Sequence, residues 1–400
     1  ALAAVNLIIP IMTILFGVGM MLSIGGSVRG GKYLGEGNVE AASAIFSKTL
    51  ISLAIYGFIV ISLGLVFEEE IFTGLGATQE LFPIMGEYYR IIMPFFLAQF
   101  AMIALYFFIR LDGLPNLAAA SLAVGAVINV ALDYLFVAVY DWGLTGAAFA
   151  TGISQTIPLL VMLYYFFWPK RRLKFSFGQK NWKEIFQAAY NGISEFTNEI
   201  SGGIIAFIFN WMMIQRGGID GVAAITVVNY LLMLGFMVFF SISDTIQVML
   251  SQNFGARQTK RIEDFLKTAS WLILLVSGIF ITALLTLSEP LILLFVDDQS
   301  GEKMLAMATE LMAYVWPVFL FSGANMLISG YLTAIHLPFQ SGIVALCRSL
   351  ILPAGFLFLL YIVSSDYRFV AALSLAEGVT FVIAFIIFLR HTPYKEVLPN

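Results

Sequence analysis

The chain has 400 residues, of which 60% are hydrophobic and 12% are charged. Soluble domains carry about 25% charged residues, so this composition excludes an ordinary soluble protein and indicates an all-α polytopic membrane protein. The net charge of −4 gives no indication of nucleic-acid binding. Cys347 is the only cysteine and the chain has two histidines, which excludes an internal disulfide bond and a histidine-rich metal site.

Eleven apolar stretches have the length of a membrane-spanning helix. Lysine and arginine gather in alternate loops, as with Arg29 and Lys32, whereas the loops between them are acidic, as at Glu68. Because basic loops of membrane proteins face the cytoplasm, we expect the C-terminus of this inner-membrane protein to be cytoplasmic. The stretches cover 1–27, 45–66, 85–111, 117–140, 146–168, 187–214, 222–250, 266–288, 305–332, 340–363 and 368–390.

The longest polar stretch divides the chain in two. It covers 169–186 and reads PKRRLKFSFGQKNWKEIF, which predicts a cytoplasmic linker along the membrane surface. Before it lies an N-terminal lobe, 1–168, with five transmembrane helices. After it lies a C-terminal lobe, 187–400, with six.

The two lobes repeat one another in sequence. The first visible helix aligns with the stretch that begins near Gly221, at an offset of 220 residues, and GLPNLAAAS at 113–121 aligns with HLPFQSGIV at 336–344, at an offset of 223. Both Leu-Pro turns fall on the same side, so we expect two parallel six-helix bundles related by a pseudo-twofold axis along the membrane normal. The counterpart of the helix 187–214 would precede Ala1, so the repeat predicts a first helix that is missing from this sequence.

A polar group inside the first lobe predicts a cation site. Asn129 and Asp133 are four residues apart in an apolar run, so they share one helical face. A carboxylate at the centre of a bilayer costs about 2.5 kcal/mol or more and therefore marks a functional site by default. Thr151 follows in the first turns of the next helix, and oxygen ligands of these kinds suit a small cation or a proton. The alternative is a structural hydrogen-bonded pair.

Four further charged residues lie within predicted helices. Glu195 and Glu199 share one face and could carry a coupling proton, since neighbouring carboxylates raise one another's pKa; the alternative is that Glu195 is merely solvated near the cytoplasmic end. Arg348 and Glu377 lie in the middle of their helices, and we expect a buried ion pair with a structural rather than a transport role.

Aromatic side chains are candidates for the lining of a substrate cavity. Aromatic surfaces adapt to varied ligands and hold cations over their ring faces. The candidates are Tyr230, Phe236 and Trp316.

The chain resembles the multidrug and toxic compound extrusion (MATE) family. The resemblance rests on ALAAVNLIIP at 1–10, RGGKYLGEGN at 29–38, the Asn129 to Thr151 segment ending in GLTGAAFAT, and SQNFGAR at 251–257. It implies two six-helix lobes around a central cavity, and export of organic cations and drugs in exchange for Na⁺ or H⁺. It also implies a cation site at Asn129, Asp133 and Thr151 in the N-terminal lobe, or at an acidic residue such as Glu195 or Glu199 in the first helix of the C-terminal lobe.

Three alternatives to an antiporter can be weighed by the residues that each function would require. A flippase for lipid-linked saccharides would need a strongly cationic cavity, and Arg90 and Arg348 are the intramembrane cations that the sequence offers. An enzyme would need paired histidines or a Ser–His arrangement in the membrane, which the sequence does not offer, and a non-transporting role is the third alternative. We therefore expect a monomeric antiporter for cationic or amphipathic substrates, with no cofactor, no metal beyond the coupling ion and no nucleic-acid partner.

Overall fold

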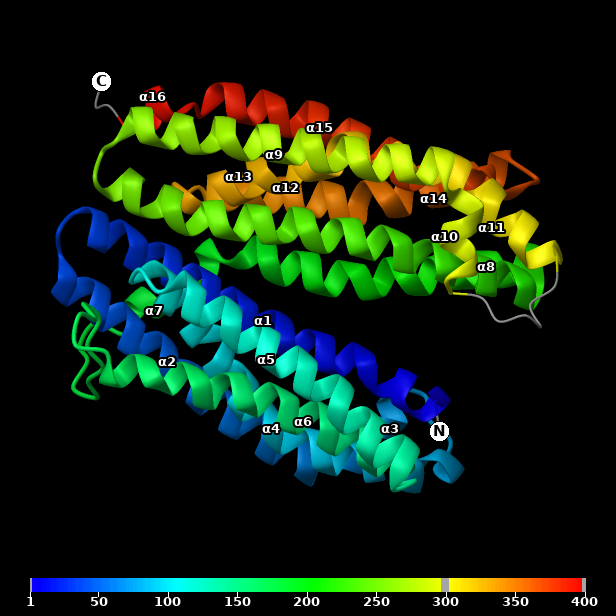
Figure 1. The fold of residues 1–400 in the computed structure, drawn as a ribbon, viewed down its shortest axis with the longest axis horizontal. Helices are drawn as coiled ribbons and strands as arrows, with labels where there is room; N and C mark the ends of the chain where they lie inside the picture. Colours follow the sequence, from blue (N-terminus) through cyan, green and yellow to red (C-terminus); the bar gives the residue numbers. More distant parts are fainter. Residues whose placement is uncertain (1, 296–301, 398–400) are drawn as a thin grey trace. The chain divides into compact units, whose positions relative to one another are not determined.

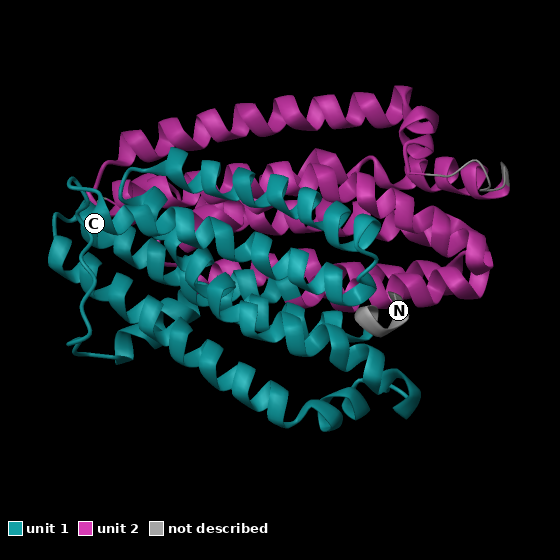
Figure 2. Ribbon diagram, turned by 60° about the horizontal axis from the view of Figure 1, so that its bottom comes forward, with its two compact units in different colours: residues 1–199 teal, residues 200–400 magenta. Residues whose placement is uncertain are grey.

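The computed structural model describes residues 2–295 and 302–397 as helices joined by turns and loops. Nine helices in these ranges are long and apolar enough to cross a membrane, and a bent helix pair would make ten. The chain divides into two compact units, Ala1–Glu199 and Ile200–Asn400, which Figure 2 shows in different colours. The structure thus agrees with an all-helical polytopic membrane protein.

The first unit is built from helices that run from α1 to the start of α8 (Figure 1). Long apolar runs favour helices here because a helix satisfies all of its backbone hydrogen bonds internally. The elements are α1 (Leu2–Gly35), α2 (Val39–Val66), α3 (Glu68–Gly74), α4 (Phe82–Leu111), α5 (Pro115–Asp133) with a π-helical continuation η2 (Tyr134–Val139), α6 (Gly143–Met162) with a 3₁₀ end (Leu163–Phe167), and α7 (Lys183–Asn191).

The second unit follows the same pattern of long helices with short breaks. Its core is a continuous cluster of apolar side chains that includes Phe239, Phe319 and Tyr331. The elements are α8 (Ile193–Gly255), α9 (Thr259–Thr286), α10 (Ser288–Leu293), α11 (Glu302–Val315), α12 (Val318–Ala334), α13 (Pro338–Leu346), a π-helical segment η4 (Cys347–Ile351), α14 (Leu352–Val363), a 3₁₀ turn (Tyr367–Ala371), α15 (Ala372–Arg390) and α16 (Pro393–Val397).

The range of α8 holds two helical segments, in agreement with the two spans, 187–214 and 222–250, that the sequence predicts; the difference lies in the position of the unit boundary. The two segments meet at Gly218, where φ is 59° and ψ is −149°. This conformation is essentially restricted to glycine. The beginning of α8 lies in the first unit, so the boundary after Glu199 falls inside the helix that the sequence assigns to the C-terminal lobe.

A second difference concerns the stretch 305–332, which the sequence predicts as one helix. The structure has two helices, Lys303–Val315 and Val318–Ala334, inclined by 51°. Pro317 lies at the break, and a proline inside a helix removes one backbone hydrogen bond and clashes with the preceding turn.

Two turns recur at the sequence offsets that link the lobes. Gly113 and His336, which are 223 residues apart, both have positive φ, and Leu114 N and Leu337 N donate to the carbonyls of Ile109 and Leu332. Gly37 and Arg257, which are 220 apart, also share positive φ. The next residues, Asn38 and Gln258, donate to Tyr33 O and Asn253 O. The same kinds of helix-ending turn therefore occur in both units at positions 223 and 220 residues apart.

The stretch 169–186 is held against helices of the first unit. Lys174 N donates to Ser43 Oγ at 3.0 Å, and Ser176 N donates to Ser47 Oγ at 3.0 Å. Its last residues form the start of α7, which packs on α1 through glycines at the contact. A Cβ atom added to Gly25 would lie 1.8 Å from Ala188 O, and one added to Gly192 would lie 2.1 Å from Met21 O. Side chains larger than hydrogen would force these helices apart.

Candidate functional site

A polar cavity of about 220 Å³ lies among α1, α4, α6 and the beginning of α8 in the first unit. Its apolar lining consists of Met12, Phe16, Ile92 and Phe96. Its polar lining consists of Thr13, Tyr88, Gln99, Thr151, Gln155 and Glu199. One carboxylate, two amides and three hydroxyls therefore converge on a space that could hold several water molecules or a hydrated ion.

Helical spacing explains how these side chains meet. Thr151 and Gln155 are four residues apart on α6, so they project from one face. Glu199 reaches the same space because α8 approaches α1 closely at Gly17, where an added Cβ atom would lie 3.3 Å from Glu199 Cβ. The site is thus assembled from four helices, with its carboxylate supplied by the last of them.

Asp133 and Asn129 do not line this cavity, although the sequence groups both with Thr151. They lie on α5, which packs against α6, and both are partly buried. Tyr88 lies near both places, because it lines the cavity together with Thr151 and is close to Asp133. The structure therefore brings Thr151 and Glu199 together at one cavity and places Asp133 near its Tyr88 side.

Neither Glu199 nor Asp133 makes an ion pair with another residue of the described ranges 2–295 and 302–397. An ionised carboxylate in a membrane protein is costly without a counter-charge. Each of these two groups can therefore lower its energy by binding a cation or a proton.

The expected pair of Arg348 and Glu377 is present inside the second unit. Arg348 Nε donates to Glu377 Oε1 at 2.9 Å, with 13% and 8% of the two side chains exposed. Asn325 Nδ2 donates to Glu377 Oε2 at 2.7 Å and to the Glu377 carbonyl at 2.9 Å. Arg348 belongs to the π-helical segment η4 and also stands 5.5 Å from the ring of Phe236. Both oxygens of this carboxylate are therefore held by protein groups.

The three aromatic candidates have different surroundings within the second unit. Tyr230 is 51% exposed and stacks on Phe295 with ring centroids 5.8 Å apart. Phe236 contacts Phe319 as well as Arg348, and Trp316 packs partly buried against the apolar core. Tyr230 is accordingly the candidate with the most accessible ring.

Glu195 is buried, with 7% of its surface exposed, so the interpretation that it is merely solvated is wrong. It lies one turn before Glu199 on α8, inside the first unit rather than in a C-terminal lobe. Glu199 lines the cavity and Glu195 does not, so the two carboxylates have different environments.

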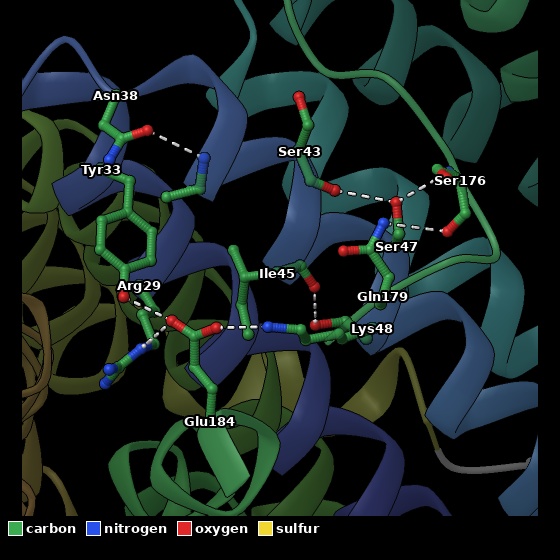
Figure 3. Close-up of polar contacts among 12 residues, drawn as sticks. Arg29, Tyr33, Asn38, Ser43, Ile45, Ser47, Lys48, Ser176, Gln179 and Glu184 are labelled. Carbon is green, nitrogen blue, oxygen red and sulfur yellow. Dashed lines mark hydrogen bonds and ion pairs between the residues drawn. The ribbon is translucent and has the colours of Figure 1, made fainter. Parts of the chain in front are cut away.

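A further ionic cluster, which the sequence did not predict, surrounds Glu184 on α7 (Figure 3). Arg29 Nε donates to Glu184 Oε1 at 2.9 Å, Lys48 Nζ donates to Oε2 at 2.6 Å, and the Tyr33 hydroxyl also donates to Oε1. Burial opposes the charge on Glu184, but the hydrogen bonds from Lys48, Tyr33 and Arg29 outweigh it and hold the pKa of this carboxyl below its usual value. The cluster fastens α7 to α1 and α2.

A second carboxylate fastens the start of the polar stretch. Asp112, which follows α4, accepts hydrogen bonds from Arg172 Nε at 2.8 Å, from Arg172 N at 2.8 Å and from the Tyr165 hydroxyl at 2.7 Å. The basic residues of 169–186 therefore do more than determine which side of the membrane this stretch faces, since Arg172 holds the stretch in place.

Comparison with known proteins identifies the family. The MatE family model matches residues 1–135 and 200–359, which is most of the chain. The chain belongs to the MatE family. The resemblance found in the sequence is thereby confirmed, and with it the expectation of a transporter rather than an enzyme.

Curated relatives of this MatE protein are bacterial. The chain is 25% identical over 346 residues to a "Probable multidrug resistance protein YoeA" of Bacillus subtilis, covering 82% of this chain and 72% of that protein. It is 22% identical over 343 residues to the "Multidrug export protein MepA" of Staphylococcus aureus, covering 83% and 73%.

Solved structures share the fold. A crystal structure of "MATE in complex with MaL6" matches 99% of this chain and 88% of that chain with a TM-score of 0.90 at 20% identity. A "multidrug resistance MATE family transporter of the MOP superfamily" in an outward-facing conformation matches with the same coverage and score.

Proposed function

We propose that this MatE protein is a secondary antiporter that exports organic cations and amphipathic drugs in exchange for Na⁺ or H⁺. The observation that carries the proposal is the polar cavity of the first unit, in which Glu199 and Thr151 face one space. The printed names of the bacterial relatives support multidrug export as the activity.

Coupling follows from the chemistry of this cavity. Carboxylate, hydroxyl and amide oxygens are ligands that a small hard cation prefers. Binding of Na⁺ or H⁺ at Glu199, or at Asp133 beyond Tyr88, removes the negative charge that attracts a cationic drug. Binding of the ion therefore opposes binding of the drug. A ligand that binds one conformation more tightly than the other shifts the population towards that conformation.

We propose that alternating access arises from two lobes that are structural repeats of one another. The matched turns at Gly113 and His336, and at Gly37 and Arg257, support a parallel repeat. The alternation of basic and acidic loops supports a cytoplasmic location for the basic loops and for the C-terminus.

The flippase alternative receives no support from the arginines that could have formed a cationic cavity. Arg90 forms two hydrogen bonds with Glu68, at 2.8 and 2.9 Å, and Arg348 is paired with Glu377. Each positive charge already has a counter-charge, which leaves little attraction for a pyrophosphate group.

Efflux from liposomes tests the proposal. The protein is reconstituted with an internal fluorescent organic cation, and release is followed under an imposed Na⁺ or pH gradient for wild type, Glu199→Gln, Asp133→Asn and the matched control Asp264→Asn. Asp264 is an exposed acid on α9, away from the cavity. We expect gradient-driven efflux in wild type and the control, with loss in Glu199→Gln, Asp133→Asn or both. Full coupling in the double variant Glu199→Gln with Asp133→Asn would overturn the proposed site, and no ion-driven efflux in wild type would overturn the antiporter.

A further inference from the structure

A second hollow, of about 410 Å³, lies on the second unit between α9 and the chain segment that follows α15. We call it the α9 groove. Figure 1 shows α16 beside the N-terminal part of α9, and these two helices are in contact. The volume falls within the range of roughly 300–1,000 Å³ that is typical of small-molecule sites. The groove belongs to one unit and is separate from the polar cavity.

The α9 side of the groove is a single helical stripe whose polarity changes along its length. The spacing of three and four residues places all of its members on one face. From the start of the helix inward, these are Glu263, Leu266, Lys267, Ser270, Trp271 and Leu274. With a rise of 1.5 Å per residue, Trp271 and Leu274 lie about 12 Å and about 16 Å farther along the helix axis than Glu263. Apart from Leu266, which is buried, the stripe thus passes from charged to hydroxyl, aromatic and aliphatic side chains.

This order matches the profile of a phospholipid monolayer. Charged side chains belong at headgroup depth, tryptophan at the interface and leucine among the acyl chains. Trp271 is 74% exposed, as expected for a ring that faces lipid. Glu263 and Lys267 stand 4.0 Å apart across one turn, which is a long contact that leaves both charges able to bind another partner.

The opposite wall is fixed rather than loose. Pro393 is buried, and the Tyr331 hydroxyl donates to the carbonyl of His391 at 2.7 Å. His391 Nδ1 lies 2.7 Å from Glu396 Oε1, which closes the turn before α16. Thr392 and Tyr394 complete the polar end of the groove on this side. A preformed groove loses less entropy on binding than one that must first be ordered.

We propose that the α9 groove binds a glycerophospholipid with a primary-amine headgroup, such as phosphatidylethanolamine. The phosphate lies at Lys267 with the hydroxyls of Ser270 and Thr392, the ammonium lies at Glu263, and an acyl chain follows Trp271 and Leu274. Charge complementarity selects this class: a zwitterionic head with a hydrogen-bonding amine satisfies both an acid and a base, whereas a purely anionic head leaves Glu263 without a partner. A choline head cannot donate a hydrogen bond to the carboxylate.

Quenching of Trp271 fluorescence measures the occupancy of the groove. The protein is reconstituted in dioleoylphosphatidylcholine vesicles that contain a small fraction of phosphatidylethanolamine, phosphatidylcholine or phosphatidylglycerol with brominated acyl chains. The difference between wild type and Trp271→Phe isolates this residue from the other five tryptophans of the chain. We expect the brominated ethanolamine lipid to associate about threefold to fivefold more strongly than the choline lipid, as one exposed ion pair of up to about 1 kcal/mol would give.

Charge variants separate the two halves of the headgroup site. Glu263→Gln should remove the preference for the ethanolamine lipid and leave association of the glycerol lipid equal or stronger. Lys267→Gln should weaken all three lipids. Asp264→Asn and Lys260→Gln are matched controls on the same helix, because neither residue lines the groove, and both should behave as wild type. Equal quenching by all three lipids would mean an ordinary lipid annulus, and strongest quenching by the glycerol lipid would mean an anionic-lipid site; either result overturns the proposal.

Discussion

The carboxylates of the polar cavity and the carboxylate of Glu377 are both inside helical units, but their partners differ. Glu199 faces a cavity with hydroxyl and amide neighbours, and it forms no ion pair with any residue of 2–295 or 302–397. Glu377 is enclosed by Arg348 and Asn325, which occupy both of its oxygens. An acid whose ligand sites remain open can exchange an ion, whereas an acid already bound by a guanidinium and an amide acts as a fixed link between helices.

Breaking the fixed link should have the largest effect. Arg348→Leu leaves Glu377 buried without its counter-charge, which should destabilise the protein by about 3 kcal/mol. Thermal unfolding in detergent measures the loss. The double variant Arg348→Leu with Glu377→Leu should recover much of it, because no charge then remains buried. A double variant as unstable as the single one would show that the pair does more than satisfy its own charges.

Removing the open carboxylate should leave stability nearly unchanged and affect coupling. Glu199→Gln keeps the size of the side chain and has no ion pair to break, so its melting temperature should match that of wild type. The dependence of efflux on the ion gradient should fall by about tenfold, which corresponds to about 1.4 kcal/mol of coupling. If Glu199→Gln instead unfolds the protein as readily as Arg348→Leu, the comparison between the two acids fails.

Tyr88→Phe tests the connection between the cavity and Asp133. The change removes the one hydroxyl of this cavity that lies close to Asp133, and it keeps the ring. A hydrogen bond contributes about 1 kcal/mol, so the ion concentration for half-maximal efflux should rise about fivefold. Tyr230→Phe serves as a matched control, because that hydroxyl lies in the other unit. An unchanged ion dependence in Tyr88→Phe would separate Asp133 from the cavity.

Glu184 extends the comparison, because it belongs to the first unit and yet is fully paired like Glu377. Its lowered pKa means that the folded state holds the carboxylate form more tightly than the unfolded state does. Its contribution to stability is complete above about pH 4.3, the usual value of a glutamate, and is lost as the pH falls through the lower pKa of the folded protein.

The difference in melting temperature between wild type and Glu184→Gln should therefore shrink on acidification, by about 2 °C. Thermal unfolding at pH 7 and at pH 3.5 gives both values. A difference that grows as the pH falls would contradict a lowered pKa.

The comparison also explains how far the sequence could predict the site. Hydropathy was sufficient for an all-helical membrane protein, and two opposite charges in the middle of their predicted helices were sufficient for the pair of Arg348 and Glu377. Spacing along α5 places Asn129 and Asp133 on one helical face, but it could not tell which helix that face meets. Asp133 is the last residue of α5, and its neighbours depend on how α5 packs on α6, which hydrophobic periodicity does not record.

Other parts of the site could not have been found from one helix at a time. Tyr88, Gln99 and Gln155 are ordinary residues of apolar helices until four helices meet. Glu184 lies at the end of a basic stretch, where the exposed face of a linker was the natural expectation. Its burial follows from the close approach of α7 to α1, which depends on Gly25 and Gly192.

Gly218 has a consequence for anyone who needs to label this protein. Residues on both sides of this turn contact other parts of the second unit: Arg216 donates to the carbonyl of Asp366 at 2.6 Å, and Asp220 pairs with Lys303 at 3.1 Å. These contacts hold both flanking helical segments in place. An epitope tag or a reporter domain inserted there would have to displace these contacts, so insertion at this turn should be poorly tolerated even though the loop between two spans is usually the first place that an engineer would choose.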